Sequence, residues 1–394
     1  MKTHQNKIEK LISELCQNGV EFFELKEVSK ISIGEFVHKN KQNPNGEYPV
    51  FNGGISETGF YDEFNNTGNK IIISARGANA GFVNRIERSY WAGNSCYTID
   101  VLDQEKLDWI FVFYYLKDKQ NKLTEDQQKG GIPAVSKKQI ENFKIPIPHI
   151  EIQQEIVKIL DNFTELEAEL EAELEARKKQ YEYYRDELLT PKKDTKYINL
   201  GDVAKIQRGA SPRPIQKYIT NDPTGVPWIK IGDTLPGSKY VTNTKQRVTT
   251  DGALKSRHLK KGDFILSNSM SYGRPYILGI DGAIHDGWAG ISDFEEKLDH
   301  DFLYYYLSSS TVQNYWDSKI NSGSVSNLNS EIIKTLPVPI PPLEEQKRIV
   351  LILDKFDALV NDISIGLPAE LKARRSQYEY YRNQLLTFQE LKSN

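Results

Sequence analysis

Two copies of one sequence pattern occupy most of this 394-residue chain, and an internal repeat constrains the fold more than any other feature. Residues 145–163 read IPIPHIEIQQEIVKILDNF and residues 338–356 read VPIPPLEEQKRIVLILDKF, at a constant offset of 193. The match resumes with QYEYYRDELLT at 180–190 and QYEYYRNQLLT at 377–387, where the offset is 197. The same structural unit is therefore expected twice, with four more residues in the second copy.

Weaker matches precede each copy and show what the repeated unit contains. FELKEVSKISIG at 23–34 resembles INLGDVAKIQRG at 198–209, and LDWIFVFYYL at 107–116 resembles LDHDFLYYYL at 298–307. The unit is a domain followed by a long helix. The predicted organisation is an N-terminal helix at 1–19, a first domain at 20–148, a central long helix at 149–194, a second domain at 195–342 and a C-terminal long helix at 343–394.

Apolar residues after each proline-rich lead-in recur at spacings of four and three, which is the heptad pattern of a helix that pairs with another helix. The predicted seam residues are Ile156, Leu160, Phe163, Leu170, Leu174, Tyr181, Ile349, Leu353, Phe356, Ile363, Tyr378 and Leu385. Two such helices would most simply pair antiparallel as a coiled coil, and burial of each stripe in its own domain core is the alternative. Gly366 and Pro368 interrupt the second stripe, so a kink or a break is expected there.

The segments before the long helices combine strands and helices. Short apolar runs such as KIIIS, CYTIDV, VPWIKI and DFILS lie between clusters of Gly, Asn, Asp and Pro, which is typical of strands joined by turns. An amphipathic helix is expected in each half, around 107–120 and 298–317. The sequence therefore predicts an α/β fold: two mixed α/β domains, related by an internal pseudo-twofold repeat and separated by two long antiparallel helices.

Charge is distributed unevenly along the chain, although its net value is only −3. Residues 196–274 contain fourteen Lys and Arg against five acids, whereas residues 149–190 contain five basic residues against twelve acids. The local field, and not the net charge, acts on a nearby nucleic acid. The second domain is therefore predicted to be basic and the central helix acidic.

Other features exclude several classes of protein. Cys16 and Cys96 have no cysteine or histidine cluster beside them, which argues against a disulfide framework or a zinc site. No apolar run approaches the ~18 residues that cross a bilayer, and the first segment is polar, so we expect a cytoplasmic protein without a membrane contact.

The proline-rich lead-in followed by Glu/Gln and Ile-Val, here IPIPHIEIQQEIVKILD and VPIPPLEEQKRIVLILD, resembles the framework regions of type I restriction-modification specificity subunits. The likeness covers about residues 20–390, nearly the whole chain. It implies that 20–148 and 195–342 are target-recognition domains, each reading half of a bipartite target in double-stranded DNA. It also implies that the helices set the spacing and dock the methyltransferase subunits.

The resemblance further implies which partners do the chemistry. Two adenine N6-methyltransferase subunits and restriction endonuclease/translocase subunits would assemble with the chain. S-adenosylmethionine, ATP and Mg²⁺ would belong to these partners, and no cofactor or metal is expected on the chain itself.

DNA contacts are expected in turn-rich loops that carry basic and amide side chains, because Lys and Arg neutralise phosphates while Arg, Asn and Gln can read base edges. In the first domain the candidates are Arg76, Asn79, Gln128, Lys129, Lys137 and Lys138. In the second domain they are Lys205, Arg208, Arg213, Asn268, Ser269, Tyr272, Arg274, Ser324, Asn327 and Asn329. For any single residue the alternative is an amide that satisfies its own turn or a solvated surface charge.

No catalytic residues are predicted. The chain has no Gly-Lys dipeptide for a phosphate-binding loop, no HExxH motif and no Asn/Asp-Pro-Pro-aromatic tetrapeptide of a methyltransferase. Asp281, Asp286, Glu295 and Lys297 could in principle form a nuclease site, but solvated surface charge is the interpretation we favour.

Two other classes of function remain open from the residues alone. A stand-alone sequence-specific DNA-binding protein could use the two unequal domains without a partner. A coiled-coil scaffold that binds only protein is the second alternative, and the basic excess of residues 196–274 argues against it.

Overall fold

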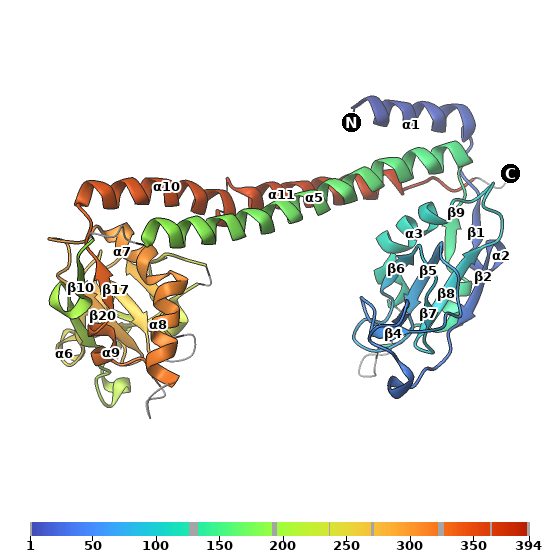
Figure 1. The fold of residues 1–394 in the computed structure, drawn as a ribbon. Coiled ribbons are helices and arrows are strands. Elements are labelled where there is room, and N and C mark those ends of the chain that lie inside the picture. The colour runs from blue at the N-terminus through green and yellow to red at the C-terminus, as the bar shows by residue number, and fades with distance from the viewer. Residues whose placement is uncertain are drawn as a thin grey trace. The chain divides into compact units, whose positions relative to one another are not determined.

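The computed structural model describes residues 2–125, 133–190, 195–235, 237–268, 272–321, 327–362 and 365–391. The chain divides into two compact units: unit 1 is Met1–Glu169 with Leu371–Asn394, and unit 2 is Leu170–Glu370. Each unit contains one mixed α/β domain and parts of the long helices (Figure 1). The long helices are α5 (Ile150–Leu189), α10 (Leu343–Asn361) and α11 (Leu367–Leu385). These features confirm the predicted fold class.

The domain of unit 1 contains a four-stranded sheet in the order β2-β8-β5-β6, a three-stranded sheet in the order β4-β3-β7 and the pair β1-β9. The strands are β1 (Phe22–Glu24), β2 (Ser29–Ile33), β3 (Tyr48–Phe51), β4 (Gly59–Tyr61), β5 (Lys70–Ser74), β6 (Val83–Ile86), β7 (Trp91–Ala92), β8 (Cys96–Val101) and β9 (Lys144–Pro146). Helix α3 (Trp109–Asp118) packs on β5 and β6, and the short helices are α2 (Leu25–Val28) and α4 (Lys137–Glu141).

The apolar run of β5 is explained by burial on both faces of its sheet. Ile71 and Ile73 are fully buried in the core that includes Phe111 of α3. Ile72, between them, belongs to a separate core that includes Tyr90. A strand with one solvated face would have alternated polar and apolar residues instead.

The domain of unit 2 has two five-stranded sheets, in the orders β11-β20-β17-β18-β14 and β12-β15-β13-β19-β16, and the pair β10-β21. The strands are β10 (Tyr197–Asn199), β11 (Lys205–Arg208), β12 (Ile219–Thr220), β13 (Val226–Ile229), β14 (Tyr240–Val241), β15 (Arg247–Val248), β16 (Arg257–Leu259), β17 (Phe264–Ser267), β18 (Pro275–Leu278), β19 (Gly282–Ile284), β20 (Trp288–Ser292) and β21 (Pro337–Pro339). The helices are α6 (Thr250–Leu254), α7 (His300–Leu307), α8 (Ser310–Asn321) and α9 (Ser330–Lys334).

The single helix expected around 298–317 is two helices, α7 and α8, so this expectation needs correction. The buried Ser309 lies between them. Its hydroxyl accepts a hydrogen bond from the backbone N–H of Val312 at 3.3 Å, which satisfies a donor in the first turn of α8. Because α8 begins at Ser310 with this contact, α7 ends before it, at Leu307.

The C-terminal long helix expected over 343–394 is likewise two helices, α10 and α11, with the interruption where Gly366 and Pro368 predicted it. A Cβ atom at Gly366 would lie 2.4 Å from the carbonyl oxygen of Ala358, so only glycine fits there. Pro368 occupies the first turn of α11, where its missing N–H has no helical partner to lose. By contrast, α5 is one helix of 40 residues.

The long helices pair within unit 1 through α5 and α11. The Phe163 ring lies 5.9 Å from that of Tyr378 and 5.8 Å from that of Tyr381. Glu167, one turn further along α5, accepts from Arg375 at 2.6 Å. Because residue numbers rise along α5 while those of its contacts fall along α11, the two segments run antiparallel.

Unit 2 repeats this pairing with α5 and α10. The Phe356 ring lies 5.6 Å from Tyr184 and 6.5 Å from Tyr181. Leu174 and Leu188 pack against the same core as Phe356.

The predicted seam residues serve both of the roles left open by the sequence. Ile156 and Leu160 are fully buried in the core that includes α3, and Ile349 and Leu353 are buried in the core that includes α7. Leu385 packs against the first of these cores, whereas Leu170 is half-buried. Ile363 lies outside the described residues. The first turns of α5 and α10 are thus domain core, and the ring contacts further along join helix to helix.

A buried glutamine joins the start of each long helix to its domain. In unit 1, the Gln153 amide donates to the carbonyl oxygens of Lys106 at 2.9 Å and Pro148 at 2.7 Å. Its Oε1 atom accepts from the backbone N–H of Asp108 at 2.8 Å. Asp108 in turn caps α3. All hydrogen-bonding atoms of this fully buried side chain therefore bind the loop before α3 or the lead-in to α5.

Gln346 makes the same three contacts in unit 2. Its amide donates to Lys297 at 2.9 Å and Pro341 at 2.8 Å, and its oxygen accepts from Asp299, the cap of α7, at 2.7 Å. A second contact is also repeated, because Tyr hydroxyls of α3 and α7 donate to aspartates of α5 and α10. Tyr114–Asp161 spans 2.7 Å and Tyr305–Asp354 spans 2.6 Å.

The two ends of the chain meet within unit 1. The backbone N–H of Val20 donates to the carbonyl of Gln389 at 2.8 Å, and that of Leu391 donates to Val20 at 2.9 Å. Helix α1 (Lys2–Leu15) packs on the same core through the buried Ile8. Lys7 of α1 also pairs with Glu155 of α5 at 2.6 Å.

We predict that Gln153→Ala lowers the free energy of unfolding of unit 1 by about 2–4 kcal/mol, because it removes a fully buried side chain and leaves the buried Pro148 carbonyl and two part-buried backbone groups without their partner. Urea denaturation of the full chain measures this. Gln154→Ala is the matched control, because this neighbouring glutamine is exposed and its loss should change stability by less than about 0.5 kcal/mol. Equal effects of the two variants would contradict the role assigned to Gln153.

We also predict an acid-sensitive contribution from Asp301 of α7. Hydrogen bonding to His300 lowers its pKa to about 2; burial opposes this, and the bond from Lys239 at 2.6 Å adds to it. Since the folded pKa lies below the ordinary 3.8, the ionised form stabilises unit 2 above pH 4 and loses this effect between about pH 4 and 2. Asp301→Asn should therefore destabilise unit 2 at pH 7, and the difference from the unsubstituted chain should shrink on acidification.

Thermal unfolding across pH 7 to 2 tests this prediction. Asp202→Asn, at an exposed aspartate of the same domain, should cause no such pH-dependent difference. A gap between Asp301→Asn and the unsubstituted chain that stays constant down to pH 2 would refute it.

Candidate nucleic-acid interface

A cavity of about 240 Å³ in unit 2 brings together several of the side chains singled out from the sequence. It is lined by Arg208, Asn268, His285, Asp286, Gly287, Asn327, Leu328, Asn329 and Ser330. Four of these, Arg208, Asn268, Asn327 and Asn329, are predicted DNA-contacting residues. Ser330 begins α9, which lies at the end of the domain away from α10 (Figure 1).

Backbone pairing holds the parts of this cavity together. Arg208 ends β11 opposite Ala289 of β20. The backbone N–H of Leu328 donates to the carbonyl of Asn268 at 3.0 Å, which ties the segment before α9 to the end of β17. At Gly209 a Cβ atom would lie 2.0 Å from the carbonyl oxygen of His285, so glycine allows the strand end to approach this turn.

Asp286 is the electrostatic centre of the cavity. Its Oδ1 atom accepts from the Ser211 hydroxyl at 2.8 Å and lies 2.9 Å from Nε2 of His285. Burial by itself raises the pKa of Asp286, but Ser211, His285 and Arg208 outweigh it and lower the pKa below its usual value. The carboxylate is therefore ionised at neutral pH.

His285 is held in one tautomer by its neighbours. Its Nδ1 atom accepts from the backbone N–H of Gly287 at 3.0 Å, so the proton lies on Nε2, which faces Asp286. This arrangement fixes the direction of the Asp286 side chain.

Asn268 offers an acceptor that is not used within the described part of the chain. Its Nδ2 atom donates to the carbonyl of Asp286 at 3.3 Å. Its Oδ1 atom is buried and has no hydrogen-bond partner among the described residues. A buried acceptor without a partner costs free energy.

The other candidates of the second domain have different surroundings. Asn329 caps α9, since its Oδ1 atom accepts from Ile332 at 2.9 Å, and Tyr272 donates to Asp317 at 2.7 Å. Arg213 and Arg274 are exposed. Ser269 and Ser324 lie outside the described residues.

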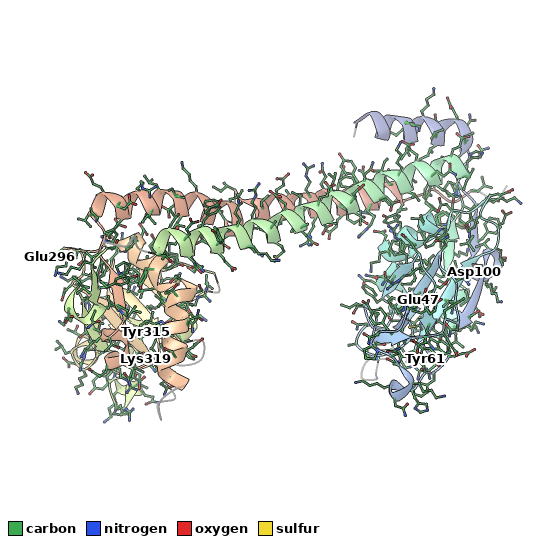
Figure 2. All side chains as sticks on the ribbon, viewed as in Figure 1. Glu47, Tyr61, Asp100, Glu296, Tyr315 and Lys319 are labelled. Atoms are coloured by element: carbon green, nitrogen blue, oxygen red, sulfur yellow. The ribbon has the colours of Figure 1, made fainter. Side chains whose placement is uncertain are left out.

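Lys205 lies apart from Arg208 although both belong to β11. It begins that strand and lines a different cavity together with Asp202 and Glu296. Figure 2 shows Glu296 nearer to the long helices than Tyr315 and Lys319 of α8 are. Lys205 is therefore not part of the surface around Arg208.

In unit 1 the candidates lie on two adjoining loops. Arg76 forms an isolated bridge with Ala134, and the backbone N–H of Gly77 donates to Pro133 at 2.9 Å. Gly77 has a φ of +89°, which favours glycine. Arg76 and Asn79 are exposed, and so are Lys137 and Lys138, which begin α4 just beyond the second loop. Gln128 and Lys129 lie outside the described residues.

The two domains present equivalent pairs of loops with different side chains. Val135 donates to the carbonyl of Ala75 at 2.8 Å, as Leu328 does to that of Asn268. Ala75 thus stands where the second domain has Asn268.

Sequence reasoning missed His285 and Ser211, and it considered Asp286 only as part of a nuclease site. A lone histidine and a loop serine carry no spacing signal. The contacts that His285 and Ser211 each make with Asp286 depend on the pairing of β11 with β20.

Among the described residues no group of three or more His, Cys, Asp or Glu side chains is placed to hold a metal ion. None of the helices in the described ranges has the length and apolar character that a membrane crossing requires.

Comparison with known proteins identifies the family. The model of the type I restriction modification DNA specificity domain matches residues 17–176 and 192–373. A putative type I restriction enzyme specificity subunit of Haemophilus influenzae is 31% identical over 402 residues, covering 98% of this chain and 100% of the relative. The EcoR124I/EcoR124II specificity subunit of Escherichia coli is 34% identical over 304 residues, covering 73% of this chain and 72% of the relative.

Solved structures share the fold. The S subunit of a type I restriction-modification system from M. genitalium superposes with a TM-score of 0.56 at 19% identity, over 93% of this chain and 96% of that chain. A chain from a structural study of the assembly and conformational transition of a type I system gives a TM-score of 0.66 at 17% identity. The match covers 93% of this chain and 97% of that chain.

The relatives are subunits, so a stand-alone DNA-binding protein is not favoured. The chain belongs to the DNA specificity subunits of type I restriction-modification systems, the non-catalytic subunits through which these complexes recognise a DNA sequence.

Proposed function

We propose that each domain of this chain reads one half of a bipartite DNA target and that the long helices set the separation between the two halves. The observation that carries this proposal is the repeated pair of loops, Ala75 with Val135 and Asn268 with Leu328, built on equivalent hydrogen bonds. The same framework with different side chains is what two readers of unequal half-sites require.

The charge of the second domain supports a DNA ligand. Residues 196–274 contain nine more basic than acidic side chains, and Arg213 and Arg274 are exposed. Phosphate contacts of this kind would supply affinity that falls with salt, while the cavity at Arg208 would supply base discrimination.

The remaining parts of the proposal concern the partners. We infer that two adenine N6-methyltransferase subunits dock on the helices and that restriction endonuclease/translocase subunits join them in the cytoplasm. S-adenosylmethionine, ATP and Mg²⁺ would be bound by those subunits.

A groove on unit 1 supports docking of a methyltransferase subunit. It has a volume of about 490 Å³ and lies between α1, α5 and α11. Its apolar lining includes Ile12, Ile159, Phe163 and Leu166. Leu166 is 45% exposed, and an exposed apolar group on such a groove favours burial by a partner.

We predict that co-expression of this chain with its cognate methyltransferase produces adenine methylation at one bipartite motif. Replacing residues 195–342 by the corresponding domain of another specificity subunit should change one half of that motif and leave the other half unchanged. Methylome sequencing measures both outcomes. Methylation that does not depend on the chain, or a swap that changes both halves, would overturn the proposal.

We further predict that Leu166→Arg weakens association with the methyltransferase subunit at least tenfold, because it puts a charge into the apolar groove. Affinity capture of the tagged methyltransferase measures the bound fraction. Leu102→Arg is the matched control, since Leu102 is 65% exposed in unit 1 but does not line this groove. Unchanged association of the Leu166 variant would exclude the groove as the docking site.

A further inference from the structure

We propose that Arg208 and Asp286 together read one G·C base pair in the half-site bound by the second domain. This inference rests on the proposed function and assigns base specificity to one cavity of it. Three features support it: the placement of the Arg208 guanidinium, the ionised carboxylate of Asp286 beside it and the donors and acceptors on the edge of a G·C pair.

The Arg208 guanidinium is oriented through Nε, and its outer nitrogens have no hydrogen bond to any of the described residues. Its Nε atom donates to the carbonyl oxygen of Asp286 at 3.4 Å. The side chain is exposed at the end of β11 and lines the cavity. An arginine held in this way presents its two terminal amino groups as a fork, and such a fork fits O6 and N7 of guanine.

Asp286 supplies the complementary acceptor next to this fork. Within the described ranges, its side-chain contacts with Ser211 and His285 both involve Oδ1. A carboxylate has about four acceptor positions, so it retains capacity for a donor from outside. Cytosine N4 is the donor that lies beside guanine O6 in the major groove, and aspartate accepts from it.

The same pairing of charges argues against a phosphate at this place. An ionised carboxylate repels a phosphate oxygen, whereas the edge of a G·C pair offers acceptors and a donor side by side. Asn268 and Asn329, which also line the cavity, are polar but uncharged. A mixed set of donors and acceptors matches a base edge better than an anion.

The first domain has a different side chain at the position equivalent to Arg208. Ile33 ends β2 as Arg208 ends β11, and each is followed by a glycine whose backbone N–H donates to the neighbouring strand, at 3.1 Å for Gly34 and 2.8 Å for Gly209. Ile33 is 53% exposed. The strand end is therefore a shared position whose side chain differs between the two readers.

The test uses the assembled complex of this chain with its methyltransferase. The motif from methylome sequencing identifies the G·C pairs of the second half-site, and competition binding compares duplexes carrying each of the four base pairs at those positions. The unsubstituted complex should prefer G·C at one position by roughly tenfold or more. Arg208→Ala and Asp286→Ala should each reduce that preference at the same position.

Arg208→Gln provides a second readout, because glutamine pairs with adenine and should shift the preference at that position from guanine towards adenine. Lys205→Ala is the control on the same strand and should leave the preference intact. Equal loss of affinity for all four duplexes in Arg208→Ala would identify a phosphate contact and overturn the inference. The absence of any G·C preference in the second half-site would also overturn it. In either case a 195–342 swap that still changes one half-motif leaves the proposed function standing.

Discussion

Two buried glutamine side chains, Gln153 and Gln346, determine how each long helix leaves its domain. Each is held by three hydrogen bonds to backbone atoms of the lead-in and of the loop before α3 or α7. A buried amide with all its partners in place tolerates little displacement, because any shift leaves a polar atom unsatisfied. This anchor of the long helix is therefore the same in both copies, although the sheets of the two domains differ in their number of strands and Arg208 and Ile33 differ at one shared strand end.

The repeated unit has different boundaries in the sequence and in the structure. In sequence, each copy is a domain followed by its helix. In space, each domain packs the start of that helix and the end of the other one: Ile156 and Leu386 share one core, and Leu353 and Leu189 share the other. The near-identity of QYEYYRDELLT and QYEYYRNQLLT follows from this arrangement, because the penultimate residue of each segment is a leucine buried in a domain core.

Much of the fold could be predicted because it depends on local or periodic signals. The apolar run at Ile71–Ile73 indicated a buried strand, and Gly366 with Pro368 indicated the interruption between α10 and α11. The DNA-reading surface depends on pairing between distant strands, so single residues could not place it. Lys205 and Arg208 are three residues apart, yet they line different cavities because they lie at opposite ends of β11. The cap at Asn329 was detectable, since an asparagine directly before an apolar helix is a common start signal.

The hydrogen bonds that join Val20 to Gln389 and Leu391 make unit 1 discontinuous, whereas unit 2 is a single stretch of chain. During synthesis, the ribosome releases every residue of unit 2 before it releases the last residues of unit 1. The domain that is translated first is thus completed later than unit 2, because its core includes Leu386. Loss of the segment around Leu386 would therefore damage a core formed mostly by residues that lie more than 200 positions earlier in the sequence.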